Sequence, residues 1–200
     1  MPTSKVPLFA GFLLSLILAS CSGFHDVMSE ASGLGVVSGN RSTFDGSESV
    51  TMSPAPLYGQ DFGGNALFLG AAWNAKDSDQ VGILLEHQGN TSYGSTYLGI
   101  RGLDINIDGK VSSYSVGGGT DFNSGSYNTV SKTIYTRSEN VVTVPLSVLR
   151  KMMDASDCRI RIRTSQGFED RIFSRETEGG MKMAKSHMRK FLAKVDSVKR

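Results

Sequence analysis

The stretch LDINIDG, residues 103–109, alternates apolar and polar side chains and then ends in Asp-Gly. A half-buried strand has this period of two, because successive side chains point to opposite faces of a sheet. The Asp-Gly pair tolerates the positive φ angles of a tight hairpin turn. We therefore predict a strand over 97–108, a turn at Asp108 and Gly109, and a second strand over 111–116.

Similar segments lie on both sides of this hairpin. Short alternating or apolar runs, separated by clusters of Gly, Asn, Asp and Ser, predict further strands over 66–73, 81–87, 129–136, 140–144, 158–164 and 168–174. Residues 117–125 are Gly-rich and are predicted to form a loop.

Two segments have helical rather than strand periodicity. Pro145 suits the first turn of a helix, and apolar residues then recur at helical spacing up to residue 154. The same spacing predicts an amphipathic helix over 180–195. Many strands and few helices predict a mainly β fold. We expect an antiparallel β-sandwich or open barrel with a short helix and a C-terminal amphipathic helix.

The first 20 residues have the layout of a secretory signal peptide. Lys5 is the one charged residue, and an apolar run of about 14 residues follows it. This run is shorter than the roughly 20 residues that a membrane-spanning helix needs. We therefore predict that segment 1–20 is removed from the mature protein.

The signal ends in Leu18-Ala19-Ser20-Cys21, which resembles the lipobox of bacterial lipoproteins. In that family the cysteine thiol carries a diacylglyceryl group with palmitate-like chains, and the leader is cut before the cysteine. The resemblance implies that Cys21 is the lipidated first residue of the mature protein. Two or three acyl chains give effectively permanent anchoring, since each buried methylene adds about 0.8 kcal/mol of membrane affinity. An ordinary leader with a chance cysteine is the alternative.

The residue after the cysteine bears on the location of the protein. In diderm bacterial lipoproteins an aspartate at this position favours the inner membrane, whereas here it is Ser22. The resemblance therefore implies a lipid-anchored protein of the outer membrane that faces the periplasm. Lipidation of Cys21 would also leave Cys158 without a disulfide partner. Alternation puts Cys158 on the face of Ile160 and Ile162, so we predict a small buried apolar residue, with a reactive thiol as the alternative.

Charge and composition divide the mature chain. Without the leader it has 20 basic and 19 acidic residues, a balance that argues against a nucleic-acid partner. Residues 21–57 are rich in Gly and Ser and show no sustained apolar period, and their four acidic residues outnumber the one basic residue, Arg41. We predict that 21–57 is a tether that clears the lipid headgroups, and that 58–200 is the β-rich globular domain.

Asp104, Asn106 and Asp108, followed by Gly109, match the opening of an EF-hand calcium loop. The pattern fails at its twelfth position, where Ser115 replaces the bidentate glutamate, and no helix is predicted before it. A polar strand face that leads into an Asp-Gly turn explains the same residues. Calcium is therefore an alternative ligand of these residues, and no other cofactor is predicted.

Arg159, Arg161 and Arg163 alternate with apolar residues and are predicted to share one strand face. Guanidinium groups at steps of about 6.6 Å could bind phosphates or carboxylates bidentately. An anionic envelope component or an acidic envelope protein would supply such groups. Alternatively, the arginines form exposed ion pairs with carboxylates on neighbouring strands, such as Glu169 and Asp170. Pairs of that kind contribute only about 0 to 1 kcal/mol each.

The C-terminal helix is basic on its polar side, which carries Lys182, Lys185, Arg189, Lys190 and Lys194, and Lys199 and Arg200 follow it. A basic amphipathic helix can lie on an anionic membrane surface. We favour the other interpretation, in which its apolar stripe packs on the core of its own domain and the basic residues face water.

No signature of an enzyme is present. The chain lacks the G-x-S-x-G, H-E-x-x-H and P-loop patterns. His87 is the only histidine in the predicted sheet region, and the adjacent Glu86 would point to the opposite face of the strand. We predict a lipid-anchored binding or structural module of the cell envelope, not an enzyme. The alternatives are a cell-wall or lipid hydrolase and a calcium-stabilised adhesion-type domain.

Overall fold

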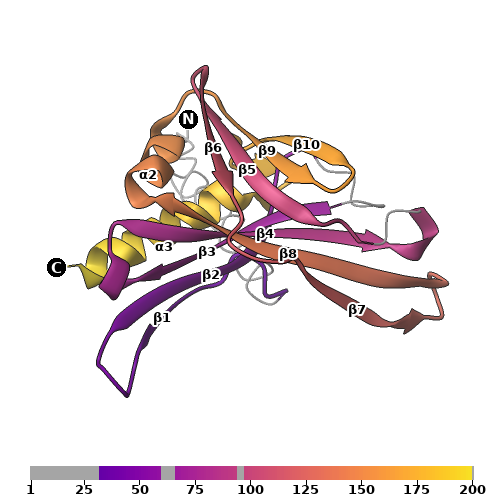
Figure 1. Ribbon diagram of the computed structural model, residues 1–200, viewed down its shortest axis with the longest axis horizontal. Helices are drawn as coiled ribbons and strands as arrows, with labels where there is room; N and C mark the ends of the chain where they lie inside the picture. Colours follow the sequence, from indigo (N-terminus) through magenta and orange to yellow (C-terminus); the bar gives the residue numbers. More distant parts are fainter. Residues whose placement is uncertain (1–31, 60–65, 94–96, 200) are drawn as a thin grey trace, which may run out of the picture.

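The computed structural model describes residues 32–59, 66–93 and 97–199. The described chain is mainly β, with two large antiparallel sheets that pack face to face, a third sheet of two short strands, and two α-helices (Figure 1). The larger sheet is curled into a half-barrel, so the predicted fold class is confirmed. The predicted signal peptide and Cys21 lie outside the described residues.

The six-stranded sheet has the strand order β1-β2-β3-β4-β8-β7. Its strands are β1 (Val37–Arg41), β2 (Glu48–Pro56), β3 (Ala66–Asn74), β4 (Gln80–Asn90), β7 (Asp121–Asn128) and β8 (Thr133–Pro145). The short 3-10 helices η1 (Ala75–Asp77) and η2 (Thr91–Tyr93) follow β3 and β4.

The four-stranded sheet has the order β10-β9-β5-β6 and lies above the larger sheet in Figure 1. Its strands are β5 (Ile100–Ile107), β6 (Lys110–Ser115), β9 (Cys158–Thr164) and β10 (Gly167–Ile172). The predicted hairpin is confirmed, because Ile107 pairs with Lys110 and the turn residues Asp108 and Gly109 have φ angles of 48° and 91°. A short ladder joins β11 (Thr177–Glu178) to β12 (Met181–Lys182).

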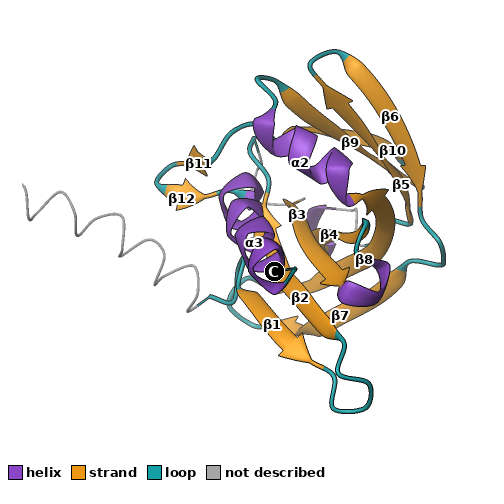
Figure 2. Ribbon diagram, turned by 90° about the vertical axis from the view of Figure 1, so that its left-hand side faces the viewer, coloured by secondary structure: helices purple, strands orange, loops and turns teal. Residues whose placement is uncertain are grey.

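The two helices cover the larger sheet. Helix α2 (Leu146–Asp154) follows β8 and packs near β4 and β8. Helix α3 (Ala184–Val198) lies along β1, β2 and β3 (Figure 2). Met188, Phe191 and Val195 of α3 are fully buried. The interpretation of this helix as a cover for its own core is therefore confirmed. No helix in the described ranges is long and apolar enough to cross a membrane.

The hydrophobic core fills the space between the sheets. Leu85 of β4, Leu103 of β5 and Ile160 of β9 are at most 1 % exposed and belong to one apolar cluster. Cys158 lies in the same cluster and is also fully buried. Burial raises the pKa of its thiol to about 12, which matches the predicted apolar role rather than a reactive thiolate.

The predicted tether over 21–57 is wrong for residues 37–56, which form β1 and β2 of the larger sheet. Val50 and Met52 of β2 are buried in the core. Their alternation is too short to be read from the sequence, because a register shift between Met52 and Ala55 interrupts it. Strand β1 is exposed along most of its length and so has no apolar pattern. The folded domain therefore begins before residue 58.

The central part of the chain contains two further differences. The predicted loop over 117–125 overlaps β7, whose residues are all exposed and therefore show no alternation. The predicted strands 129–136 and 140–144 are one long strand, β8. Its middle turns Thr136, Ser138 and Asn140 inward, so the buried face is polar there and the apolar period disappears.

Residues before β1 are held against α3 by a close contact at Gly35. A Cβ at this position would lie 2.2 Å from the ring of His187, and Gly35 has a φ of +63°. Gly33 has a similar φ of +74° but no atom within 4 Å of the same position. A side chain would therefore be strained at both positions by the positive φ, but only at Gly35 would it also overlap with a neighbouring side chain.

We expect Gly35→Ala to lower the free energy of unfolding by about 1–3 kcal/mol more than Gly33→Ala, because only the first substitution overpacks a contact with α3. Urea denaturation of both variants measures the difference. Equal losses in the two variants would show that the contact between Gly35 and His187 does not constrain the fold.

Candidate functional site

The outer face of the four-stranded sheet displays the arginine row. In β9 the residues Cys158, Ile160 and Ile162 point into the core, so alternation turns the intervening side chains outward. Arg159, Arg161 and Arg163 are 63 %, 45 % and 38 % exposed. They share one face, as the sequence pattern indicates.

Carboxylates flank this row on both neighbouring strands. The strand register places Asp104 of β5 and Asp170 of β10 opposite Arg161, on its two sides. Asn106 of β5 lies opposite Arg159. The face is therefore a mosaic of positive, negative and amide groups, not a continuous cationic strip.

Arg161 is held most firmly. Its Nε and Nη2 donate to the two carboxylate oxygens of Asp170 at 2.7 and 2.8 Å, and its guanidinium lies 4.1 Å from the ring centroid of Phe168. The hydrogen bond from Arg161 lowers the pKa of Asp170, so this carboxylate stays ionised at neutral pH. The pairing with Asp170 is the one that sequence analysis suggested. Glu169 instead pairs with Arg171, at 3.1 Å.

Arg163 lies across β5 toward β6. Its Nε is 3.2 Å from Asp104 Oδ1, and its Nη2 donates to the carbonyl of Tyr114 at 2.8 Å. Gly102 makes this path possible, since a Cβ there would lie 2.3 Å from Nη2 of Arg163. Arg161, Arg163, Asp104 and Asp170 together form a set of ion pairs that we call the ion-pair frame.

Arg159 differs from the other two arginines. Its hydrogen bonds within the described residues use only Nε, which donates to Asp157 at 3.0 and 3.3 Å. The two terminal nitrogens of the guanidinium are therefore available to a ligand. This is the most exposed arginine of the row.

A surface pocket of about 500 Å³ opens beside Arg159 and Arg161. Asp104, Asn106 and Asp170 also line it, and its apolar wall contains Tyr58, Val111 and Ile172. Tyr58 is brought there by a bridge to Ile172, and the guanidinium of Arg175 lies 5.9 Å from its ring centroid. Tyr58 was not predicted as a site residue from the sequence, because its position depends on a contact with a residue far along the chain.

The three predicted calcium ligands have other partners in this structure. Asp104 pairs with Arg163, Asn106 Oδ1 accepts from the amide of Gly109 at 2.9 Å, and Asp108 Oδ1 accepts from the amide of Asp157 at 2.8 Å. In the described ranges no group of three or more His, Cys, Asp or Glu side chains could hold a metal ion. Calcium binding by these residues stays a prediction.

His87 and Glu86 lie on opposite faces of β4, as predicted for adjacent strand residues. His87 faces the core, is 1 % exposed, and has a pKa lowered by burial. Glu86 is 3 % exposed, and burial is the main cause of its raised pKa. The neighbouring carboxyl of Glu139, its cross-strand partner, raises that pKa further. Sequence analysis missed this carboxyl pair, because its members lie on different strands.

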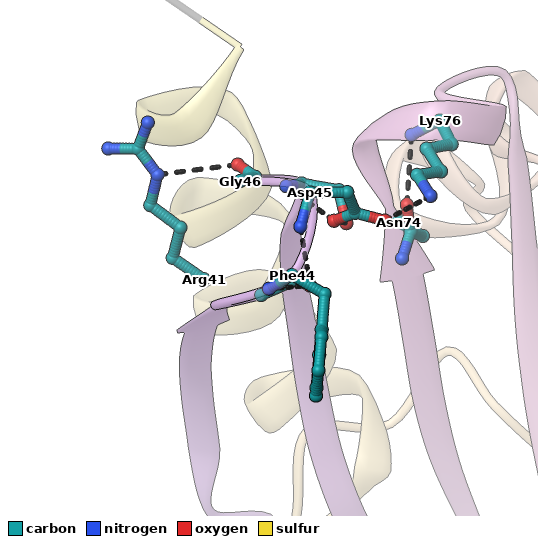
Figure 3. Close-up of polar contacts among 8 residues, drawn as sticks. Arg41, Phe44, Asp45, Gly46, Asn74 and Lys76 are labelled. Atoms are coloured by element: carbon teal, nitrogen blue, oxygen red, sulfur yellow. Dashed lines mark hydrogen bonds and ion pairs between the residues drawn. The ribbon is translucent and has the colours of Figure 1, made fainter.

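The tip of the β1–β2 hairpin presents Phe44, whose side chain is fully exposed. The loop that carries Phe44 is ordered by local hydrogen bonds (Figure 3). Arg41 Nε donates to the carbonyl of Gly46 at 3.3 Å, and Asp45 Oδ1 accepts from the amide of Ser47 at 3.0 Å. Asp45 also pairs with Lys76 of η1, so the hairpin tip is tied to the neighbouring turn.

Comparisons with protein-family models, curated proteins and solved structures found no match to this chain.

The Asp45–Lys76 pair can be tested by titration. The hydrogen bond from Lys76 is the main cause of the pKa of Asp45 lying well below its usual value. We expect Lys76→Gln to raise the pKa of Asp45 toward that of a free aspartate, measured by NMR of the carboxyl carbon against pH. Lys110→Gln, on the distant strand β6, is the control and should leave this pKa unchanged. An unshifted pKa in Lys76→Gln would contradict the tie between hairpin and turn.

Proposed function

We propose that this protein is a lipid-anchored lipoprotein of the outer membrane that faces the periplasm and acts as a binding module, not as an enzyme. The Leu18-Ala19-Ser20-Cys21 sequence supports the anchor. The pocket beside Arg159 supports the binding role. Its partner would be an anionic envelope component or an acidic patch of an envelope protein.

The observation that carries the binding role is the contrast between the arginines of one row. Arg161 and Arg163 are fixed in the ion-pair frame, whereas the terminal nitrogens of Arg159 have no hydrogen-bond partner in the described part of the chain and can form a bidentate pair. A carboxylate or phosphate fits this geometry, since the planar guanidinium donates two parallel hydrogen bonds. Because Asp104 and Asp170 are neutralised by the frame, they repel such a ligand only weakly.

The pocket walls add a second requirement. Tyr58, Val111 and Ile172 form an apolar side next to the charged one. A ligand with an anionic group attached to an apolar portion would contact both sides, and burial of its apolar surface contributes about 25 cal/mol per Å². The ligand class is therefore amphipathic and anionic.

The hydrolase alternative has a separate location, whereas the calcium alternative shares Asp104 and Asn106 with the pocket beside Arg159. A hydrolase would depend on Glu86 and Glu139 of the larger sheet, where the raised pKa of Glu86 suits a proton donor. A calcium-stabilised adhesion domain would depend on Asp104, Asn106 and Asp108. Neither alternative uses Arg159, so a test of Arg159 distinguishes the binding module from both.

Lipidation is tested by intact-mass analysis of the protein purified from its native cells. We expect a chain that begins at Cys21 and carries the mass of a diacylglyceryl group, with Cys21→Ser lacking that mass and leaving the membrane fraction. A mature chain without acyl mass on Cys21 would show that the leader is an ordinary one.

The pocket is tested by crosslinking in intact cells followed by identification of the captured species. We expect Arg159→Gln to reduce capture about tenfold or more, because a charge-assisted hydrogen bond contributes about 1.5–3 kcal/mol. The matched control is Arg41→Gln, which removes an exposed arginine from the larger sheet. Equal capture by Arg159→Gln and wild type would overturn the assignment of this pocket.

A further inference from the structure

Strand β7 is an open edge of the six-stranded sheet. All eight residues of β7 are exposed, and within the described ranges the strand pairs only with β8. Its sequence, DFNSGSYN, contains no Lys, Arg or Pro. Natural proteins usually protect an edge strand with such residues or cover it with another element, because free N–H and C=O groups recruit a further strand.

The other edge strands are shorter and protected. Strand β1 has five residues, includes Arg41 and packs against α3. Strand β6 has six residues and begins at Lys110. Strand β10 has six residues, and three of them are charged. The edge of β7 is therefore the one in the described structure that is long, fully exposed and without Lys, Arg or Pro.

The aromatic residues of β7 lie on one face because of a bulge. Phe122 and Tyr127 are five positions apart, so they would point to opposite faces of a regular strand. The register with β8 shifts between Ser124 and Tyr127, which places Phe122 opposite Ser138 and Tyr127 opposite Ile134. Ser138 and Ile134 are four positions apart on β8 and share a face, so their partners on β7 do too.

These aromatic side chains are exposed and partly stacked. Phe122 and Tyr127 are 53 % and 57 % exposed. Tyr97 packs edge to face against Phe122, with ring centroids 5.4 Å apart. An exposed aromatic surface beside an open strand edge combines hydrogen-bonding and apolar groups that a further strand could bury.

We propose that β7 pairs antiparallel with β7 of a second copy of this chain, about a two-fold axis between Ser124 and Gly125. This register places Phe122 of each copy opposite Tyr127 of the other, on the shared face that the bulge creates. Asp121 of each copy lies opposite Asn128 of the other, so the single charge of the strand meets an amide and not a like charge. Small residues occupy the axis.

The sequence of β7 favours a second copy of this chain as the partner of the open edge. A two-fold interface requires each patch to complement itself. Strand β7 meets that condition residue by residue, since its acid and its amide lie at opposite ends and its two aromatic residues are equidistant from the axis. The inference is independent of the lipid anchor and of the pocket beside Arg159.

The first test is the mass of the full chain in detergent solution, measured by light scattering across a dilution series. We expect a dimer in the wild type and at least a tenfold weaker dimer in Ser124→Lys, which brings two lysines together at the axis. Ser113→Lys, on the exposed edge strand β6, is the control and should leave the dimer intact. A monomeric wild type, or equal weakening by both variants, would overturn the proposal.

The second test fixes the register and does not depend on destabilising the protein. A mixture of Phe122→Cys and Tyr127→Cys chains should form a disulfide-linked dimer on oxidation, because opposite residues of paired strands lie within disulfide range. Each variant alone should not exceed the wild-type background, since like residues lie far from the axis. Crosslinking in the single variants but not in the mixture would exclude this register.

Discussion

The two sheets are held together by the apolar side chains that each sheet turns toward the other. Because side chains alternate along a strand, this packing determines which residues lie on the outer face of the four-stranded sheet. In β9, burial of Cys158, Ile160 and Ile162 leaves only the outer face for the intervening arginines. In β5, burial of Leu103 and Ile105 turns Asp104 and Asn106 to that same outer face. A shift of either strand by one residue would bury the charges and expose the apolar residues, so the register is strongly fixed. The arrangement of the candidate site follows from the packing of the core.

This dependence explains what the sequence could predict. Segments with one apolar and one polar face, such as β5 and β9, have a clear alternation, and their positions agree closely with the structure. Strands without that contrast were either missed or predicted with the wrong bounds. Strands β7 and β1 are exposed along most of their length and were missed. Strand β8 turns polar residues into the sheet interior, and it was predicted as two separate strands. Alternation reports the difference in burial between two faces, and it carries no information where both faces have the same environment.

The candidate site was predictable only in part, for a related reason. The row of three arginines is a local pattern, and alternation is enough to place it on one face. The difference between Arg159 and its two neighbours depends on which carboxylates the adjacent strands supply, and on Gly102 leaving room for Arg163 to cross β5. Tyr58 reaches the pocket only through its bridge to Ile172. These contacts join residues that are far apart in the sequence, and no local sequence pattern predicts them.

On the outer face of the four-stranded sheet, positive and negative side chains largely neutralise each other. The effect of their pairing is to hold the side chains in place and not to create a strong electrostatic potential. Exposed ion pairs contribute little to the free energy of folding, about 0 to 1 kcal/mol each. Their main effect is to hold Arg161 and Arg163 in one conformation, with Asp170 and the ring of Phe168 fixing the former. Under the proposed binding role, a ligand at Arg159 would meet a preformed wall and would have to order only one long side chain, which would lower the entropic cost of binding. The ion pairs of the neighbouring arginines would then assist the proposed recognition by Arg159, although they leave those arginines less free to bind.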